Sequence, residues 1–238
     1  MRIQFRPFIG LSIATAFLFA ALVGLGVWQI QRLHWKLDLI ASVDRNLRAP
    51  PLSLSQALAM GVEAAQYHRV AIVGRFDNDK QAYVFATDAN GDPAYHVIVP
   101  FKTDLGTFLV DRGIVPPGLR SPSARRSGEI DRVTQVVGVW RTPDPPGLFT
   151  PAPEAAHRVW YSRDLRAIAR ADRISLRAPV IVEADSAPNP GGWPKGGQTQ
   201  VRFRNEHLQY AVTWFALAAA LLAVYFAYHR AKGRLSLG

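Results

Sequence analysis

Two long apolar runs lie near the two ends of the chain. Residues 8–30 and residues 208–228 contain no formally charged side chain. Each run is close to the roughly 20 residues that a helix needs to cross a bilayer. We therefore expect a membrane protein with two transmembrane helices, arranged as a hairpin around one large loop.

Within that loop, stretches of β-branched and aromatic residues alternate with polar connections. They predict six strands, at residues 67–76, 81–87, 94–102, 107–115, 132–142 and 179–183. The sequence DANGD, at residues 88–92, is a hairpin signal between two of these strands. Six strands with polar connections indicate a mainly-β domain of the α+β class, an antiparallel barrel or sandwich.

Helical spacing and turn residues complete this outline. The first helix continues past its apolar run until Ala49-Pro50-Pro51 stops it, and short helices are expected at residues 55–60 and 163–173. The Pro- and Gly-rich residues 185–197 predict a flexible connector that leads back to the membrane. A phosphate-binding loop is the alternative for the glycines in this segment, but the proline and the position before a membrane helix argue against it.

The short tails orient the two helices. Arg2 and Arg6 precede the first helix, and three cations follow the second: Arg230, Lys232 and Arg234. Because basic residues next to membrane helices stay in the cytoplasm, both termini are expected there, although Arg32 and Lys36 also flank the outer side. The expected division is a cytoplasmic tail 1–7, a transmembrane helix 8–30, a periplasmic domain 31–206, a second transmembrane helix 207–228 and a cytoplasmic tail 229–238.

The first apolar run could also be a cleaved signal peptide, since basic residues precede it. A retained anchor is favoured because the run exceeds the about 7 to 15 apolar residues of a signal peptide and reaches Trp28 and Gln29 without a small-x-small cleavage site. An apolar run that begins at residue 8 leaves no room for an Arg- and Ser-rich transit peptide. We therefore expect a bacterial inner-membrane protein.

Composition excludes several kinds of chemistry. The chain has no cysteine, which rules out disulfides, thiolate metal sites and covalent haem attachment. The net charge of +10 raises nucleic acid as a partner, but no basic helix face or basic-aromatic motif supports it. A cationic protein in contact with membrane lipids, without nucleic acid, is the simpler interpretation.

Signatures of catalysis are scarce. Sequence patterns of zinc proteases, serine hydrolases and dinucleotide-binding folds do not occur, and the six histidines never pair within one helical turn. Asp111 and Arg112 could form a catalytic pair, but neighbours in a strand point to opposite faces. Asp111 is expected to fix a turn or an ion pair, and the protein is not expected to be an enzyme.

Aromatic and basic residues gather where the two helices meet the outer interface. Trp28, Arg32 and Trp35 share one helical stripe, and His207 begins the second run with Tyr210 and Trp214 behind it. A flat, anionic, hydrophobic ligand would find rings, a cation for its carboxylates in Arg32 or Lys36, and an imidazole for a metal. An ordinary interfacial belt of Trp, Tyr and snorkelling cations is the alternative, and spacing leaves both open.

Five stretches carry a more specific signal: GVWQIQRLHWK, YHRVAIVGRFD, FLVDRGIVPP, VGVWRTPDPPGLFTPAPEAAHRVWYSRDL and RNEHLQYAVTWF. In this order, and with a helix at each end, the chain resembles the Surfeit-locus family of cytochrome c oxidase assembly factors. One departure is Ile114, where the family usually has Trp after the DRG motif.

The resemblance implies a role in building the haem–copper centre in the largest subunit of cytochrome c oxidase, with haem a bound transiently and non-covalently. It implies that His207, in the HLQYAxTW motif, is an axial ligand of the haem iron and that Trp214 is the nearby motif aromatic. Arg32 as a partner of a haem propionate is an inference from spacing, with Trp28 and Tyr210 as candidate ring contacts. The haem a synthesis machinery is a further possible partner.

Two functions remain open. The first is a chaperone that holds haem a at the outer leaflet and delivers it to the nascent oxidase. The second is a scaffold that stabilises an assembly intermediate through its β domain and its helix faces, without haem. Only the first requires His207, whereas the second requires intact small-residue helix faces. Small residues on both helices would let the two helices pack closely, and they are equally compatible with packing against a foreign helix: Ala16, Ala20 and Gly24 on the first, and Ala216, Ala219, Ala220 and Ala223 on the second.

Overall fold

The computed structural model describes residues 3–143, 146–199, 203 and 205–237. The chain folds as two compact units. A helical unit consists of Met1–Ser42 and Arg202–Gly238, and a β unit consists of Val43–Val201.

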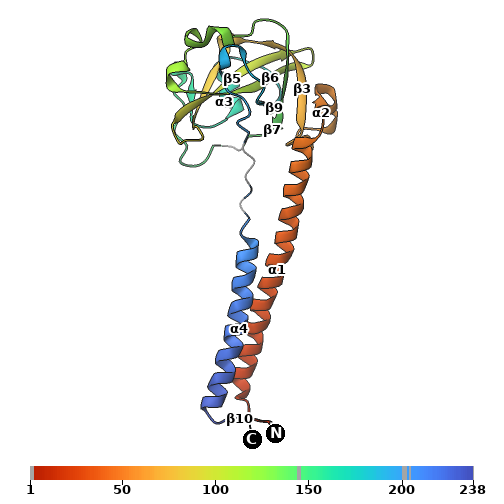
Figure 1. Cartoon of the computed structure of the whole chain (residues 1–238), viewed down its shortest axis with the longest axis vertical. Coiled ribbons are helices and arrows are strands. Elements are labelled where there is room, and N and C mark those ends of the chain that lie inside the picture. The colour runs from red at the N-terminus through yellow and green to blue at the C-terminus, as the bar shows by residue number, and fades with distance from the viewer. Residues whose placement is uncertain (1–2, 144–145, 200–202, 204, 238) are drawn as a thin grey trace. The chain divides into compact units, whose positions relative to one another are not determined.

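Two long helices form the helical unit (Figure 1). Helix α1 spans Ile9–Arg48 and helix α4 spans His207–Ala231, and both are long and apolar enough to cross a membrane. Helix α1 ends just before Pro50, as predicted. Strand β1 (Ile3–Phe5) pairs antiparallel with strand β10 (Leu235–Leu237), so the two chain ends are also joined.

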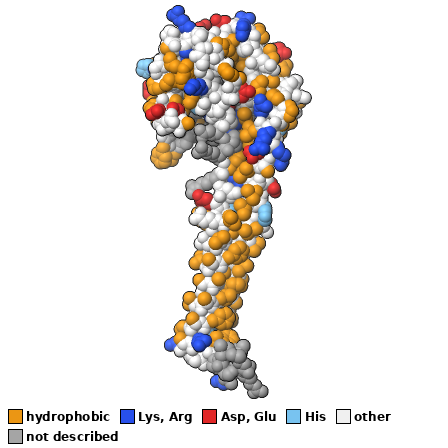
Figure 2. Space-filling view, in the orientation of Figure 1, with side chains coloured by type: hydrophobic (Ala, Val, Ile, Leu, Met, Phe, Trp, Pro, Cys, Tyr) orange, Lys and Arg blue, Asp and Glu red, His pale blue; other side chains and the backbone are white. Residues whose placement is uncertain are grey.

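Large apolar side chains cover the outside of both helices (Figure 2). Phe17 is 78% exposed, Ile9 74% and Val224 67%. A soluble protein rarely leaves so much contiguous apolar surface in water, and hydrocarbon is the natural solvent for it. The two helices therefore support the expected membrane protein, while the membrane boundaries at residues 8, 30, 207 and 228 stay predictions.

The surface by which the helices touch each other differs from the one predicted. Ala16, Ala20 and Gly24 are exposed, and so are Ala216, Ala219, Ala220 and Ala223 on the other helix. The buried small residues are Gly26 on α1 and Ala211 and Ala218 on α4. The ring of Phe215 fills the space beside Gly26, where an added Cβ would lie 2.7 Å from it. An aromatic side chain thus determines which small residues face the partner helix.

Five strands of the β unit close into a barrel. They are β3 (Arg69–Phe76), β5 (Pro93–Thr103), β6 (Gly106–Val115), β7 (Thr134–Arg141) and β9 (Leu176–Ala184). The ring closes because β3 pairs with β5 as well as with β7, and β9 lies between β7 and β6. Strand β4 (Ala82–Thr87) extends the sheet from β5, and the two-residue strands β2 (Leu52–Ser53) and β8 (Val159–Trp160) pair with β3 and β4.

The barrel is mixed rather than wholly antiparallel. Strands β6 and β9 run parallel, because the chain between them passes through β7 and helix α3 (Leu165–Ala171) before it returns. All six predicted strands are present, and the DANGD turn joins β4 to β5 with Asp88 accepting hydrogen bonds from the backbone N–H groups of Asn90 and Asp92. The two short strands and the β1–β10 pair were not predicted.

Alternation along the strands sorts side chains between two apolar clusters. The interior of the barrel holds the fully buried Trp140, with Phe101 and Phe108 around it. The opposite sheet face buries Leu109 and Ile181 beneath α3. A short helix α2 (Leu54–Met60) begins with a capping box, in which the Ser53 hydroxyl and the Gln56 side chain satisfy each other's backbone N–H groups.

The segment of residues 185–197 is not the flexible connector that its composition predicted. The N–H groups of Ile114 and Lys195 each donate to the other's carbonyl at 3.0 Å, and Gly197 donates to Ala184 at 2.9 Å. Close approach of the backbone, rather than mobility, accounts for Gly196, where an added Cβ would lie 2.0 Å from the Asp185 carbonyl oxygen. The segment is therefore a packed part of the β unit.

Candidate functional site

His207, the first residue of α4, contacts α1 through a polar side chain. Its Nδ1 lies 2.7 Å from Oε1 of Gln29, and the imidazole is half-buried. An amide oxygen only accepts hydrogen bonds, so Nδ1 carries the proton in this pair. The lone pair of the neutral ring is then on Nε2, the nitrogen available to a metal.

Arg32 lies between two indole rings. Its guanidinium carbon is 5.7 Å from the ring centre of Trp28 and 5.1 Å from that of Trp35, both within the range of cation–π attraction. Both rings are about half exposed, at 47% and 54%. The predicted stripe of Trp28, Arg32 and Trp35 is thus present as one stacked group on α1.

Helix geometry places several of these residues on one flank of the hairpin. The Gln29–His207 bond and the Phe215–Gly26 contact define the surfaces by which the helices face each other. On an α-helix, a residue three positions further along lies about 60° around the helix axis from the first. Arg32 is three residues after Gln29, and Tyr210 is three residues after His207. Each therefore lies about 60° away from the side on which its helix contacts the other. Because the helices run antiparallel, both rotations lead to the same side, and Tyr210 is 51% exposed there.

The structure thus brings some of the predicted site residues into contact, but not all of them. His207 is joined to Gln29, and Arg32 to Trp28, whereas Trp214 lies two turns further along α4, half-buried. Gln29 was not predicted. The signal available in the sequence was a polar residue at the end of the first apolar run, but its partner follows only from the pairing of the two helices.

A metal at this site would depend on its cofactor for most of its ligands. In the part of the chain that the structure describes, no group of three or more His, Cys, Asp or Glu side chains could hold an ion. One imidazole is a fitting donor for a metal that is already bound in a macrocycle such as haem.

A second polar cluster lies in the β unit. Asp111 on β6 contacts His96 Nδ1 at 2.8 Å and Arg163 Nη2 at 3.1 Å, and accepts a hydrogen bond from the N–H of Gly113. Glu183, its neighbour on β9, binds the other end of Arg163 at 3.1 Å. Burial would raise the pKa of Asp111, but His96 and Arg163 outweigh it and hold this pKa below its ordinary value.

Asp111 and Arg112 point to opposite sides of the sheet, as the strand geometry predicted. Arg112 lies over the ring of Phe76, a residue of the barrel interior, at 4.6 Å. Asp111 joins the ion-pair cluster instead, and its Oδ1 accepts a hydrogen bond from the N–H of Gly113 within strand β6. The two side chains do not form a common catalytic pair.

Comparison with known proteins covers nearly the whole chain. The model of the SURF1 family matches residues 16–219. The mouse protein named Surfeit locus protein 1 is 38% identical over 231 residues, which span 90% of this chain and 72% of the mouse protein. That of Takifugu rubripes is 35% identical, over 87% of this chain and 92% of the fish protein. A SURF1-like protein of Rickettsia felis is 30% identical, over 89% of this chain and 93% of its own length. The chain therefore belongs to the SURF1 family.

Proposed function

We propose that this protein is an assembly factor for haem–copper cytochrome c oxidase that binds haem a through His207 and aids its insertion into the largest oxidase subunit. Membership of the SURF1 family supports the assembly role. The observation that carries the haem proposal is the Gln29–His207 hydrogen bond, which leaves Nε2 of a half-buried imidazole free to bind iron.

The side chains near His207 are of chemical types that suit a haem. Haem supplies an iron that takes an imidazole nitrogen as an axial ligand. Gln29 holds the imidazole in one tautomer and orientation, while Trp28 and Tyr210 offer aromatic surface close to it along the helices. Trp214 adds a further ring two turns along α4. Arg32 is a cation suited to a propionate, since guanidinium–carboxylate hydrogen bonds are charge-assisted. A single protein ligand suits a protein that must release its cargo.

The setting of this activity is part of the proposal. The β unit would lie in the periplasm, and both termini in the cytoplasm, of a bacterial inner membrane. The basic residues of the tails support this orientation. The largest oxidase subunit is the proposed recipient, and the haem a synthesis machinery the proposed donor.

A scaffold without haem is the second candidate. It is favoured by the exposed small-residue face of α1, where Ala16, Ala20 and Gly24 face away from α4. Small residues let a foreign transmembrane helix approach closely, and such a face suits an oxidase helix. A catalytic role has no support from the clusters described above, so we propose a non-enzymatic protein.

Optical spectroscopy of the detergent-purified protein, produced together with a haem a biosynthesis system, tests the first proposal. We expect near-stoichiometric haem a in the wild type and its loss in His207→Ala. Gln29→Leu should keep the ligand but weaken haem binding by about 10- to 100-fold, as removal of a ligand's hydrogen-bond partner does in other metal sites. His34→Ala, which removes an exposed histidine of α1, is the matched control and should leave the spectrum unchanged.

A colourless wild type, or a His207→Ala protein with an unchanged spectrum, would contradict the haem proposal. Oxidase assembly should then be measured in cells that carry His207→Ala or Ala20→Leu. The scaffold predicts normal assembly with the first variant and impaired assembly with the second.

Helix contact provides a separate prediction. Gly26→Ile should push Phe215 aside and separate the helices one turn below the Gln29–His207 pair, which lowers haem a occupancy. Gly24→Ile is the matched control, because nothing lies within 4 Å of a Cβ added there. The haem content of the two purified variants is compared by absorption. Equal losses in both would mean that the Gly26–Phe215 contact does not shape the site.

A further inference from the structure

A turn in the β unit exposes two large apolar side chains next to each other. The N–H of Thr150 donates to the carbonyl of Gly147 at 3.0 Å, which makes Leu148 and Phe149 the two central residues of a β-turn. Each of these two side chains is 93% exposed. Central positions of a turn usually carry Pro, Asp, Asn, Ser or Gly, so a Leu-Phe pair is unusual there. Contiguous apolar groups held in solvent indicate a surface that binds a partner.

The base of this turn packs against the rest of the β unit. Prolines precede and follow the turn and restrict the backbone on both sides of it. They line a small hollow against β8 and α3, which is formed by residues that include Pro146, Pro151, Pro153, Trp160 and Ala167. The exposed pair therefore projects from a packed base beside α3.

Unpaired arginines surround a second hollow on the same helix. Arg166 and Arg170, one helical turn apart on α3, and Arg177 on β9 line a hollow of about 450 Å³, and none of the described residues that line it is acidic. All three arginines are exposed. In the part of the chain that the structure describes, their side chains form no ion pair or hydrogen bond. Like charges four residues apart on a helix repel each other, so this short basic face attracts an anion. It was not predicted from the sequence.

The turn and the basic face are neighbours. Arg166 lines a further hollow together with Pro146, the residue before the turn. Glu63 and Asp164 line that hollow as well, so an anion is expected on the other side of Arg166, in the hollow with three arginines.

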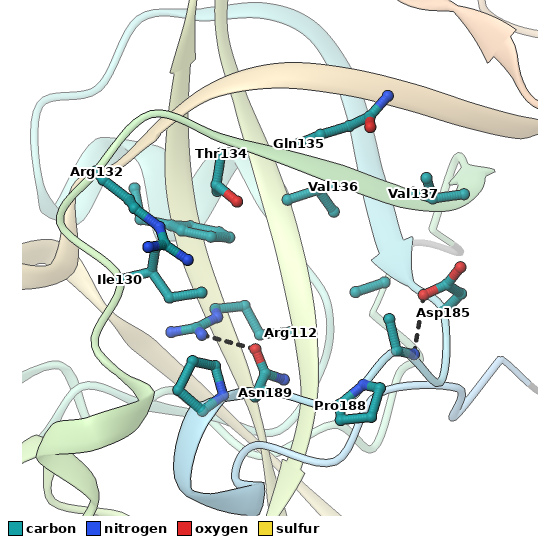
Figure 3. A pocket seen from close by; sticks show the side chains of 14 residues that line it. Arg112, Ile130, Arg132, Thr134, Gln135, Val136, Val137, Asp185, Pro188 and Asn189 are labelled. Carbon is teal, nitrogen blue, oxygen red and sulfur yellow. Dashed lines mark hydrogen bonds between the residues drawn. The ribbon is translucent and has the colours of Figure 1, made fainter.

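These arginines differ from the buried cation of the barrel. Arg112, beside the cavity drawn in Figure 3, is 1% exposed, and its Nη2 donates to the Gly128 carbonyl at 2.7 Å and to Asn189 Oδ1 at 2.9 Å. Its guanidinium joins parts of the β unit and is out of reach of any ligand. The arginines of α3 and β9 carry their charge at the surface, where a partner can meet it.

We propose that the Leu148–Phe149 turn and the arginines beside it form a docking surface for an anionic bilayer. The two apolar side chains enter the outer part of the lipid layer, and the arginines bind its phosphates. Apolar side chains next to Arg or Lys are typical of segments that lie in a membrane interface. Guanidinium and phosphate form charge-assisted, bidentate hydrogen bonds, so a hollow lined by three arginines suits a phospholipid headgroup.

The helices of the same chain favour a bilayer over a protein as the occupant. Because α1 and α4 are long and apolar enough to cross a membrane, lipid is present near the β unit at a high effective concentration. Helix α1 rises roughly 20 Å between Ile30, the expected end of the membrane span, and Val43, the first residue of the β unit. A domain of this size has a radius of gyration of about 15 Å, so its surface can reach the headgroups.

Spin labelling of the full chain in nanodiscs tests this surface. The chain has no cysteine, so a label on Leu148→Cys is the only one. Collisions with a water-soluble nickel complex and with lipid-soluble oxygen distinguish a label in water from a label in lipid. Phe17→Cys, on the apolar outside of α1, gives the lipid value, and Ala89→Cys, in the exposed DANGD turn, gives the water value. In nanodiscs of phosphatidylethanolamine and phosphatidylglycerol in equal parts, we expect the label at position 148 to shift from the water value toward the lipid value.

Substitutions separate the apolar and the basic contributions. Phe149→Asp should return the label at position 148 to the water value, and it should not disturb folding because the side chain is exposed. Each cation near an anionic surface strengthens attachment by about fivefold, so Arg166→Gln with Arg170→Gln should lower the ratio of immersed to free label by about 25-fold. Arg75→Gln with Arg126→Gln is the matched control, because it removes the same charge from exposed arginines outside both hollows.

The proposal is overturned if the label at position 148 keeps the water value in the anionic nanodiscs, if it is immersed equally in nanodiscs of phosphatidylcholine alone, or if the two double variants behave alike. A label shielded from nickel and oxygen alike would mean that a protein surface covers the turn, and would also overturn it. No readout uses haem, so this surface can succeed or fail independently of the function of His207.

Discussion

Replacing Gly113 with alanine is expected to lower the free energy of unfolding of the β unit by more than about 3 kcal/mol, because backbone strain and a backbone clash combine there. Gly113 has a φ of +109°, which disfavours residues with a Cβ. An added Cβ would also lie 1.9 Å from the Lys195 carbonyl oxygen. Relief of the clash would break the paired hydrogen bonds between Ile114 and Lys195. Thermal and urea unfolding, followed by circular dichroism, measure the loss.

Two glycines separate the causes. Gly91 has a φ of +89° but nothing within 4 Å of an added Cβ, so Gly91→Ala isolates the backbone strain at about 1–2 kcal/mol. Gly118→Ala, where φ is ordinary and the space is open, should have little effect. If Gly113→Ala cost no more than Gly91→Ala, residues 185–197 would not be held against β6 as the structure has them.

The strands could be predicted because their signal is local. Alternation of side chains and a DANGD turn depend only on residues close in sequence, and β4, β5 and β6 follow it closely. Closure of the barrel is not local. It depends on the short β3–β5 pairing at Arg75 and Phe76, and on the parallel pairing of β6 with β9. Neither pairing can be inferred from the alternation of side chains along a single strand.

Glycine and proline content misled the prediction for residues 185–197. Such composition is typical of a flexible linker, but glycine is also required wherever two backbones approach closely. At Gly128 an added Cβ would lie 2.3 Å from the Trp193 carbonyl oxygen, so the partner segment also has a glycine facing it. Only the tertiary structure distinguishes a mobile glycine from a packed one.

Only the part of the candidate site that lies on a single helix could be predicted from the sequence. The stripe of Trp28, Arg32 and Trp35 follows from residue spacing. The structure adds that the Arg32 guanidinium lies within cation–π distance of both rings. The partner of His207 depends on the register between two helices, because Gln29 lies 178 residues before it in the sequence. The contact of Phe215 with Gly26 belongs to the same register. It explains why the alanine faces predicted for contact between the helices lie outside the surface by which the helices touch.

Asp111→Asn is expected to destabilise the β unit by about 3–5 kcal/mol, the usual cost of removing one partner from a buried ion pair. Asp111 is 3% exposed, and its carboxylate is shared by His96, Arg163 and the N–H of Gly113. Asparagine keeps the shape of the side chain but not the charge, so Arg163 retains only Glu183 as an anionic partner in this cluster. Urea unfolding at neutral pH measures the difference. Lys102→Gln is the matched control: the lysine is exposed, and Asp77 keeps Lys80 as a second partner, so the loss of this pair should change stability by at most about 1 kcal/mol.

Acid should remove the same interaction from the wild type. The pKa of Asp111 in the folded protein lies below its ordinary value of 3.8, so the folded state binds the proton less readily than the unfolded chain does. The resulting stabilisation is present above about pH 4 and is lost as the pH falls through the folded pKa. Asp111→Asn has no such group to titrate, and its stability should therefore fall less steeply below pH 4. Parallel acid profiles for the two proteins would mean that other carboxylates dominate, and that the ion pairs of Asp111 contribute little to holding β6 and β9 together.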